Sequence, residues 1–254
     1  MPLNGQRVVA VVEARMTSSR LPGKVLLPAG GQPLVQVLVE RLRRVSRLDE
    51  IVIATTVNAT DDPIVELARR IGVSVFRGSE EDVLERVVKC LQAHRAEVCV
   101  EVTGDCPLAD PVIVDEALDA FATAPGRVYV SNSDPHRSVP AGLDVQIFSA
   151  SALSQLDRET RDPADREHVS YGFYRPESSD CWRPHFIKHP STVGAEKLWL
   201  SLDHREDYEL IKALHEEVGA KTPGYGAREI IAWIRAHPAL HDRCIALRPG
   251  WAMP

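Results

Sequence analysis

This sequence lacks CxxC cysteine pairs, long apolar runs and an excess of basic residues, and each of these absences argues against a class of protein. The five cysteines are scattered and include no CxxC pair, which argues against a disulfide framework or structural zinc and favours a reducing cytoplasm. No apolar run approaches the roughly 18–20 residues of a membrane span, and residues 1–7 contain no signal-peptide core. The net charge of −6 argues against a general nucleic-acid binder, which needs a broad basic face. We therefore expect a cytoplasmic protein that binds neither membranes nor nucleic acid.

Strand and helix patterns alternate along the first half of the chain. With 254 residues, 44% of them hydrophobic, the chain is long enough for one large domain. Short apolar runs predict strands at residues 8–12, 51–55, 73–76 and 98–103. The helices between them are expected to begin near Pro33, at Asp62-Pro63, at Ser79 with Asp82, and at Asp110-Pro111. The alternation continues to about residue 120 and predicts an α/β fold with a doubly wound, mostly parallel sheet.

The alternation weakens beyond Pro125, and residues 178–193 look irregular. The tail from Arg248 is expected to be loosely attached. The elements predicted in this half are strands at 128–131, 143–148 and 198–202, a helix from Asp162-Pro163 through His168 and Tyr171 to Arg175-Pro176, one after Asp203, and one over 227–237.

A basic loop, residues 14–24, follows the first predicted strand. It contains no acid, three hydroxyl residues in a row, a Pro-Gly turn, and three cations: Arg15, Arg20 and Lys24. A buried strand that runs into such a loop places backbone N–H donors and positive side chains around one point, which is how proteins hold polyphosphates. The loop is not a Walker A motif, because position 18 is not Gly and Val25 follows the lysine, and it is not a GxGxxG fingerprint. The alternative interpretation is a solvated basic loop.

Asp105 is the carboxylate that the predicted topology brings to this loop. In a doubly wound sheet the first strand lies centrally and the fourth joins its other side, so ligands bind beyond the carboxyl ends of these strands. The basic loop follows the first strand and Asp105 follows the fourth. A carboxylate among phosphate-binding cations is a typical Mg²⁺ ligand. Alternatively, Asp105 only shapes the turn before the next helix.

The loop, read as A-R-M-T-S-S-R-L-P-G-K-V-L, resembles the signature of the cytidylyltransferase-like sugar-nucleotide enzymes, which include the CMP-3-deoxyoctulosonate and CMP-acylneuraminate synthetases. The resemblance is closest to the branch named after spore coat polysaccharide biosynthesis protein F. Further matching stretches follow in the family's order over about residues 8–215. They are F-R-G-S-E-E-D-V-L from Phe76, T-G-D-C-P-L from Thr103, G-L-D-V from Gly142, R-E-H-V from Arg166, and Leu202-Asp203 through Asp207-Tyr208.

The resemblance implies a Rossmann-like nucleotidyltransferase fold in a single domain, 1–254. Within it, a nucleotide-binding half would span about 8–125, and a smaller acceptor-binding and dimer-contact half about 126–254. The resemblance also implies CTP as the donor, Mg²⁺ as the cofactor and a homodimer.

Site residues are carried over by their positions in the matching motifs. Arg15 and Lys24 would hold the triphosphate, with Arg20 nearby, and Asp105 would act with them in catalysis. Asp105 and Asp203 would bind the metal. The residues that would contact the nucleotide are Ala14, Arg15, Ser19, Arg20, Lys24, Arg77, Ser79, Thr103 and Gly104, and those that would contact the acceptor are Asp144, Glu167 and His168.

Several of these assignments have a structural alternative in the sequence itself. Asp203 with Glu206 three residues later is typical of a helix cap. His168 could pack in the core rather than contact an acceptor, and Asp144 could serve only its turn. Two positions depart from the family pattern: position 13 is Glu, where Gln is common, and position 17 is Thr, where Gly is usual. Glu13 could touch the metal shell, read the base or alter the choice of donor.

The expected reaction is attack by an acceptor oxygen on the α-phosphorus of CTP, with release of pyrophosphate. The product would be a CMP-linked sugar, sugar acid, sugar phosphate or related compound of polysaccharide or specialised-metabolite biosynthesis. One alternative is a glycosyltransferase that uses a nucleotide sugar, although Asp105-Cys106-Pro107 lacks the second Asp of a D-x-D pair. Others are a nucleotidyltransferase that uses GTP or another triphosphate, and a non-catalytic nucleotide-binding protein.

Overall fold

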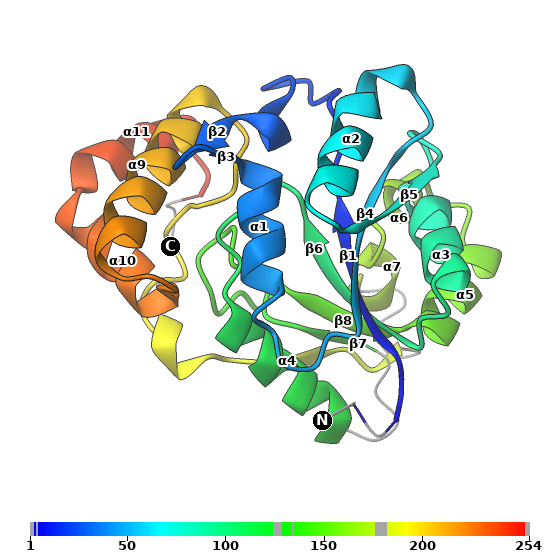
Figure 1. Ribbon diagram of the computed structural model, residues 1–254. Helices are drawn as coiled ribbons and strands as arrows, with labels where there is room; N and C mark the ends of the chain where they lie inside the picture. The colour runs from blue at the N-terminus through cyan, green and yellow to red at the C-terminus, as the bar shows by residue number, and fades with distance from the viewer. Residues whose placement is uncertain (1–2, 4, 124–128, 134, 176–181, 252–254) are drawn as a thin grey trace.

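A seven-stranded sheet with helices on both faces is the centre of the computed structural model, which describes residues 3, 5–123, 129–133, 135–175 and 182–251 (Figure 1). Strands β5, β4, β1 and β6 lie side by side and each pair of neighbours among them is parallel. Strand β8 is antiparallel to β6 and to β7, and β9 is parallel to β7. This arrangement confirms the predicted mostly parallel sheet. In spatial order the strands are β5 (Ser74–Gly78), β4 (Glu50–Thr56), β1 (Val8–Glu13), β6 (Val98–Thr103), β8 (Gln146–Ser149), β7 (Tyr129–Ser131) and β9 (His185–Phe186).

Strand β1 lies between β4 and β6 and is parallel to both, so the predicted central position of the first strand is correct. Its residues Val8–Val12 are fully buried, because their side chains point alternately to the two faces of the sheet and helices cover both faces. Val8, Ala10 and Val12 belong to one core cluster, and Val9 and Val11 to the other. The carboxyl ends of β1 and β6 therefore meet at one edge of the sheet.

Helices pack against both faces of the sheet. The apolar sides of α1, α2, α4, α9 and α10 share one core cluster, and those of α3 and α5 share the other. In Figure 1, α9–α11 gather at one side of the sheet and α3, α5 and α6 at the other. The helices are α1 (Leu34–Leu42), α2 (Asp62–Arg70), α3 (Val83–Ala93), α4 (Pro111–Thr123), α5 (Ala150–Glu159), α6 (Pro163–Glu167), α7 (Tyr171–Tyr174), α9 (Arg205–Lys221), α10 (Ala227–Ala236) and α11 (Pro238–Ala246).

Short elements connect these helices and strands. The small two-stranded sheet pairs two segments that follow the basic loop. These short elements are the 3₁₀ turns η1 (Lys24–Leu26), η2 (Ala59–Asp61) and η3 (Pro190–Thr192), and the strands β2 (Pro28–Ala29) and β3 (Gln32–Pro33).

The predicted helix from Asp162 to Arg175 is wrong in one respect, because it is broken into α6 and α7. Asp162 caps α6 as expected, by accepting a hydrogen bond from the Ala164 N–H at 2.9 Å. The backbone leaves the helical region at His168, where φ is −110° and ψ is 77°. The break turns His168 toward the end of β1. The predicted end at Pro176 lies outside the described residues.

The predicted strand at 198–202 is also wrong, since only Trp199 pairs there, in an isolated parallel bridge with Ala141. Gly142 explains the close approach: its φ is +97°, and a Cβ there would lie 2.4 Å from the backbone of Leu200. The other late strand is shorter than predicted and begins at Gln146, because Asp144 accepts the Gly142 N–H at 2.8 Å and closes a turn.

Smaller differences concern the ends of elements. The cap of α2 is Asp61, one residue before the predicted Asp62. Helix α10 ends at Ala236. The sequence interpretation missed the next helix, α11, which begins at a proline. The predicted boundary near residue 125 and the start of the strand at 128 lie outside the described residues.

Candidate active site

The basic loop leaves β1 and is anchored at both ends. Gly23 has φ of +71°, a conformation that glycine adopts without strain, and its N–H donates to the carbonyl of Met16 at 2.9 Å. The Met16 N–H donates to Oδ1 of Asp61 at 2.8 Å. Asp61 is fully buried at the end of η2 and also accepts hydrogen bonds from Thr55 and Thr56 of β4. Burial opposes ionisation of Asp61, but these hydrogen bonds outweigh it and lower its pKa.

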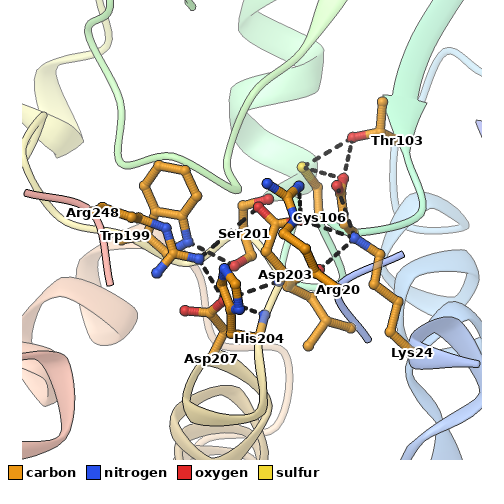
Figure 2. Close-up of polar contacts among 12 residues, drawn as sticks. Arg20, Lys24, Thr103, Cys106, Trp199, Ser201, Asp203, His204, Asp207 and Arg248 are labelled. Carbon is orange, nitrogen blue, oxygen red and sulfur yellow. Dashed lines mark hydrogen bonds and ion pairs between the residues drawn. The ribbon is translucent and has the colours of Figure 1, made fainter. Parts of the chain in front are cut away.

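Lys24 joins the loop to the two predicted metal carboxylates. Its ammonium nitrogen Nζ lies 3.3 Å from Oδ2 of Asp105 and 3.1 Å from Oδ1 of Asp203, and donates to the Leu202 carbonyl at 2.6 Å. The side chains of Lys24 and Asp203 are 11% and 8% exposed, so this ion pair is well shielded from water. Arg20 approaches the same Oδ1 of Asp203 at 2.6 Å from a more exposed position. Figure 2 shows Arg20 and Lys24 gathered near Asp203.

The position of Asp203 follows from the segment before α9. The Leu202 N–H donates to the carbonyl of Asp105 at 2.8 Å, which holds the two loops side by side. The cap of α9 is His204, and Oδ2 of Asp207 accepts the N–H groups of Asp203 and His204 at 3.0 and 2.7 Å. The cap interpretation of Asp203 is therefore wrong, because the capping box is shifted by one residue: His204 is the cap, Asp207 takes the part expected of Glu206, and the Asp203 carboxylate turns toward Lys24 (Figure 2).

A cavity of about 330 Å³ opens between the loop and the end of β6. Gly104 follows β6 beside the end of β1, where its N–H donates to the Glu13 carbonyl at 2.8 Å, and a Cβ there would lie 2.7 Å from that carbonyl oxygen. Ten of the predicted site residues line the cavity: Ala14, Arg15, Ser19, Arg20, Lys24, Thr103, Gly104, Asp105, Glu167 and His168.

Four predicted residues lie outside that lining: Asp203, which contacts Lys24 as described above, and Arg77, Ser79 and Asp144. Arg77 donates to the Thr56 and Asn58 carbonyls at 2.8 Å and pairs with Asp62, so it braces the start of α2. The hydroxyl of Ser79 accepts the N–H of Asp82, the cap of α3. Asp144 pairs with Arg137 in its own turn. Their contacts with nucleotide or acceptor remain predictions.

The loop also meets Glu80, which precedes α3. Oε1 of Glu80 accepts the hydroxyl of Thr17 and lies 3.5 Å from Arg15, while Oε2 accepts the amide of Asn58. The unusual Thr17 thus ties the loop to the segment before α3. Arg15 is held at one side of the cavity by this network.

The sequence interpretation missed the acid pair beneath the cavity. Glu13 and Glu101 leave β1 and β6 on the same face of the sheet, and the charge of Glu13 opposes ionisation of Glu101. Burial raises the pKa of both, that of Glu101 well above its usual range. Arg86 of α3 also lines the cavity and is attracted by Glu13. Glu13 drew attention as a family departure, but no pattern in the sequence signals Glu101 or Arg86.

The prediction of a loosely attached tail from Arg248 is wrong. The guanidinium of Arg248 lies 4.0 Å from the ring centre of Trp199 and donates to Oδ2 of Asp207 at 2.6 Å (Figure 2). Asp207 is 1% exposed, so its negative charge requires a cationic partner. The tail therefore supports the start of α9, where Asp203 lies.

Asp105 and Asp203 are suited to a divalent metal. Both are hard oxygen donors, and both contact the ammonium of Lys24, so the space between them already favours a cation. In the described part of the chain, His, Cys, Asp and Glu form no cluster of three or more that could hold a metal by itself. A hard ion such as Mg²⁺ would take one or two carboxylates and complete its coordination with phosphate oxygens.

Comparison with known proteins identifies the family. The family model described as cytidylyltransferase matches residues 9–222. The chain belongs to the cytidylyltransferase family. This membership favours a nucleotidyltransferase over the glycosyltransferase alternative.

The cytidylyltransferase is similar to several proteins over most of its length. Spore coat polysaccharide biosynthesis protein SpsF of Bacillus subtilis is 34% identical, with 91% of this chain and 95% of the relative covered. The 3-deoxy-manno-octulosonate cytidylyltransferase of Geobacter sulfurreducens is 35% identical, with 85% and 95% covered. A cytidylyltransferase structure from Leptospira borgpetersenii superposes with a TM-score of 0.85 at 30% identity, covering 93% of this chain and 97% of that one. These relatives confirm the resemblance to the SpsF branch and the nucleotidyltransferase fold.

Proposed function

We propose that this cytidylyltransferase transfers CMP from CTP to a sugar acid or a related sugar acceptor, with release of pyrophosphate. The observation that carries the proposal is the contact of Lys24 with both Asp105 and Asp203 at the mouth of the basic loop. The relatives support the choice of substrates, because one is named for 3-deoxy-manno-octulosonate and another for spore coat polysaccharide.

The loop cations would act on the charge of the triphosphate. CTP carries close to four negative charges, which repel an incoming oxygen nucleophile. Arg15, Arg20 and Lys24 line the cavity and would neutralise that charge as it moves onto the leaving pyrophosphate. Because the cations are held by Glu80, Asp105 and Asp203 before the substrate arrives, little reorganisation accompanies the reaction.

Asp105 and Asp203 would hold the metal, and we propose Mg²⁺. When bound, the metal would supply Lewis-acid stabilisation of phosphate oxygens. The side chain of Lys24 already contacts both carboxylates and that of Arg20 contacts Asp203, so these residues would keep the phosphate tail and the metal site together. Gly104 and Ala14 would let the nucleotide approach the backbone at the end of β1.

The experiment offers the purified protein CTP, GTP, UTP or ATP with Mg²⁺ and a panel of sugar acids and sugar phosphates. The proposal expects acceptor-dependent release of pyrophosphate with CTP and a CMP-linked product by mass spectrometry. In a parallel reaction that offers nucleotide sugars in place of the triphosphates, release of a nucleoside diphosphate would instead support the glycosyltransferase alternative. A preference for GTP or another triphosphate would correct the donor.

Assembly and location complete the proposal. No helix in the described ranges has the length and apolar character needed to cross a bilayer. We propose a cytoplasmic enzyme that forms a homodimer through the half beyond about residue 126, as the family resemblance implies. Light scattering coupled to gel filtration tests the dimer, and a mass of 28.1 kDa would contradict it.

A further inference from the structure

Polar contacts, rather than packing on every side, hold the Asp203 carboxylate in the site. Its Oδ1 faces Lys24 and Arg20, and its backbone N–H donates to Oδ2 of Asp207 at 3.0 Å. A groove of about 380 Å³ opens beside it, lined in part by Asp203 itself and by the tail over residues 247–251. The groove gives the carboxylate room to rotate out of the site, so its direction depends on the backbone from which it projects.

One oxygen of Asp207 fixes that backbone. Oδ2 accepts the N–H groups of Asp203 and His204 at 3.0 and 2.7 Å, and Nη2 of Arg248 donates to it at 2.6 Å. Oδ1 is buried and has no hydrogen-bond partner among the described residues. The orientation of the Asp207 carboxylate therefore depends on the contacts of Oδ2, of which the charge-assisted bond from Arg248 is the strong one.

Arg248 is held in turn by contacts outside the site. Its Nη1 donates to a carbonyl in the last turn of α11 at 2.7 Å, and its guanidinium lies over the ring of Trp199. The indole N–H of Trp199 donates to the Ser201 carbonyl at 2.8 Å, and its backbone N–H donates to Nε2 of His241 at 3.0 Å. The end of α11 and the segment that leads into α9 are thus joined through Arg248 (Figure 2).

A lysine does not reproduce this set of contacts. The planar guanidinium stacks on Trp199 and donates from two different nitrogens, toward α11 and toward Asp207. An ammonium group carries its charge at a single nitrogen and has no flat face. Position 248 therefore requires arginine for its geometry as well as for its charge.

We propose that Arg248 is a positioning residue for the metal carboxylate Asp203, and that it raises the affinity of the nucleotide-bound site for a divalent cation. Acting through Asp207, it keeps the Asp203 carboxylate directed toward Lys24. The inference rests on the assignment of Asp203 to the metal in the proposed function. Arg248 lies beyond residue 222, where the match to the family model ends, so that match assigns it no part in the reaction.

The test measures how much a metal tightens nucleotide binding, so it needs no turnover. Calorimetry titrates each protein with a CTP analogue that has a methylene bridge between the α and β phosphates, once with Mn²⁺ and once with EDTA. The ratio of the two dissociation constants is the metal factor. The variants are Arg248→Lys, Arg248→Met and Asp203→Asn, with Arg243→Lys as the control, because Arg243 lies on α11 and is 52% exposed. Circular dichroism establishes a temperature at which each variant is folded.

The proposal expects the same metal factor in the wild type and in Arg243→Lys, and the loss of most of it in Asp203→Asn. Arg248→Met should lower the metal factor by about tenfold or more, the scale on which loss of a group that orients a metal ligand weakens metal binding. Arg248→Lys, which keeps a charge near Asp207 but loses the stacking, should lower it less. The affinity measured with EDTA should stay at the wild-type value in both Arg248 variants, because the loop cations that receive the phosphates are unchanged.

A wild-type metal factor in both Arg248 variants would overturn the inference, and Arg248→Lys alone decides if Arg248→Met does not fold. An equal loss of affinity with Mn²⁺ and with EDTA would also overturn it, since that pattern belongs to a residue that only stabilises the fold. If Mn²⁺ does not tighten binding to the wild type, the metal assignment of the proposed function fails and this inference fails with it. The expected pattern without transfer of CMP to any acceptor would refute the proposed transfer and leave Arg248 as a positioning residue of a metal site.

Discussion

The side chains of Lys24 and Asp203, 179 positions apart in the sequence, meet at 3.1 Å in a shielded ion pair. The same ammonium lies 3.3 Å from Asp105. The basic loop, the turn after β6 and the start of α9 are therefore one ionic unit. A substitution of Lys24, Asp105 or Asp203 should therefore disturb the positions of the other two side chains.

Replacing Lys24 with Met should lower kcat by on the order of 10²–10³, because one preorganised charge is removed from the phosphate site. Pyrophosphate release measures the effect, and circular dichroism confirms that the variant folds. Lys89→Met serves as the control, since Lys89 pairs with Glu85 on the exposed surface of α3. A loss smaller than about tenfold would contradict the assignment of Lys24 to the transition state.

Replacing Asp203 with Asn should raise the Mg²⁺ concentration that gives half-maximal rate and lower kcat. The physical reason is that an amide oxygen is a poorer ligand for a hard cation than a carboxylate. A Mg²⁺ titration of the initial rate measures both effects. Asp242→Asn, at an exposed position on α11, should leave the titration unchanged. An unaltered Mg²⁺ requirement in Asp203→Asn would show that this residue does not hold the metal.

Replacing Arg248 with Ala should destabilise the fold by about 2–4 kcal/mol, because Asp207 would keep a buried charge without its cationic partner. Urea unfolding measures the free energy. Arg243→Ala is the matched control: Arg243 is 52% exposed and pairs on the surface, so this variant should unfold at the wild-type midpoint. Equal midpoints for the two variants would refute a structural role of Arg248.

Replacing Glu101 with Gln should stabilise the protein increasingly as the pH rises. Burial raises the pKa of Glu101 in the folded chain, whereas the unfolded chain releases this proton near 4.5. Rising pH therefore favours the unfolded wild type, by up to about 1.4 kcal/mol per pH unit between these two pKa values. The variant lacks this proton, so its advantage should be absent below pH 4.5 and grow above it. Urea unfolding at pH 4 to 8 measures the difference, and a constant difference would contradict the expectation.

The basic loop and Asp105 could be predicted from the sequence, because their place in the site depends on local sequence and on a general rule of topology. The basic loop is contiguous, so Arg15, Arg20 and Lys24 were found together. Asp105 came from the rule that the carboxyl ends of adjacent parallel strands share one edge of the sheet. Both deductions needed only the order of the elements.

The remaining parts depend on contacts that a linear pattern does not reveal. The spacing of Asp203 and Glu206 predicts a helix cap, but His204 and Asp207 form the capping box instead and leave the Asp203 carboxylate to Lys24. Glu101 sits in a buried strand, where an apolar residue is the normal expectation, and its partner is 88 residues earlier in the printed sequence. Arg248 follows no strong pattern, because its function depends on Trp199 and Asp207 from another part of the chain.

The close packing at Gly104 limits which positions can be mutated to change the substrates of this enzyme. A Cβ there would lie 2.7 Å from the Glu13 carbonyl oxygen. Any side chain there would push apart the two strand ends that carry the loop and the metal carboxylate. A mutant library should therefore vary the exposed neighbour Thr103 and leave Gly104 fixed.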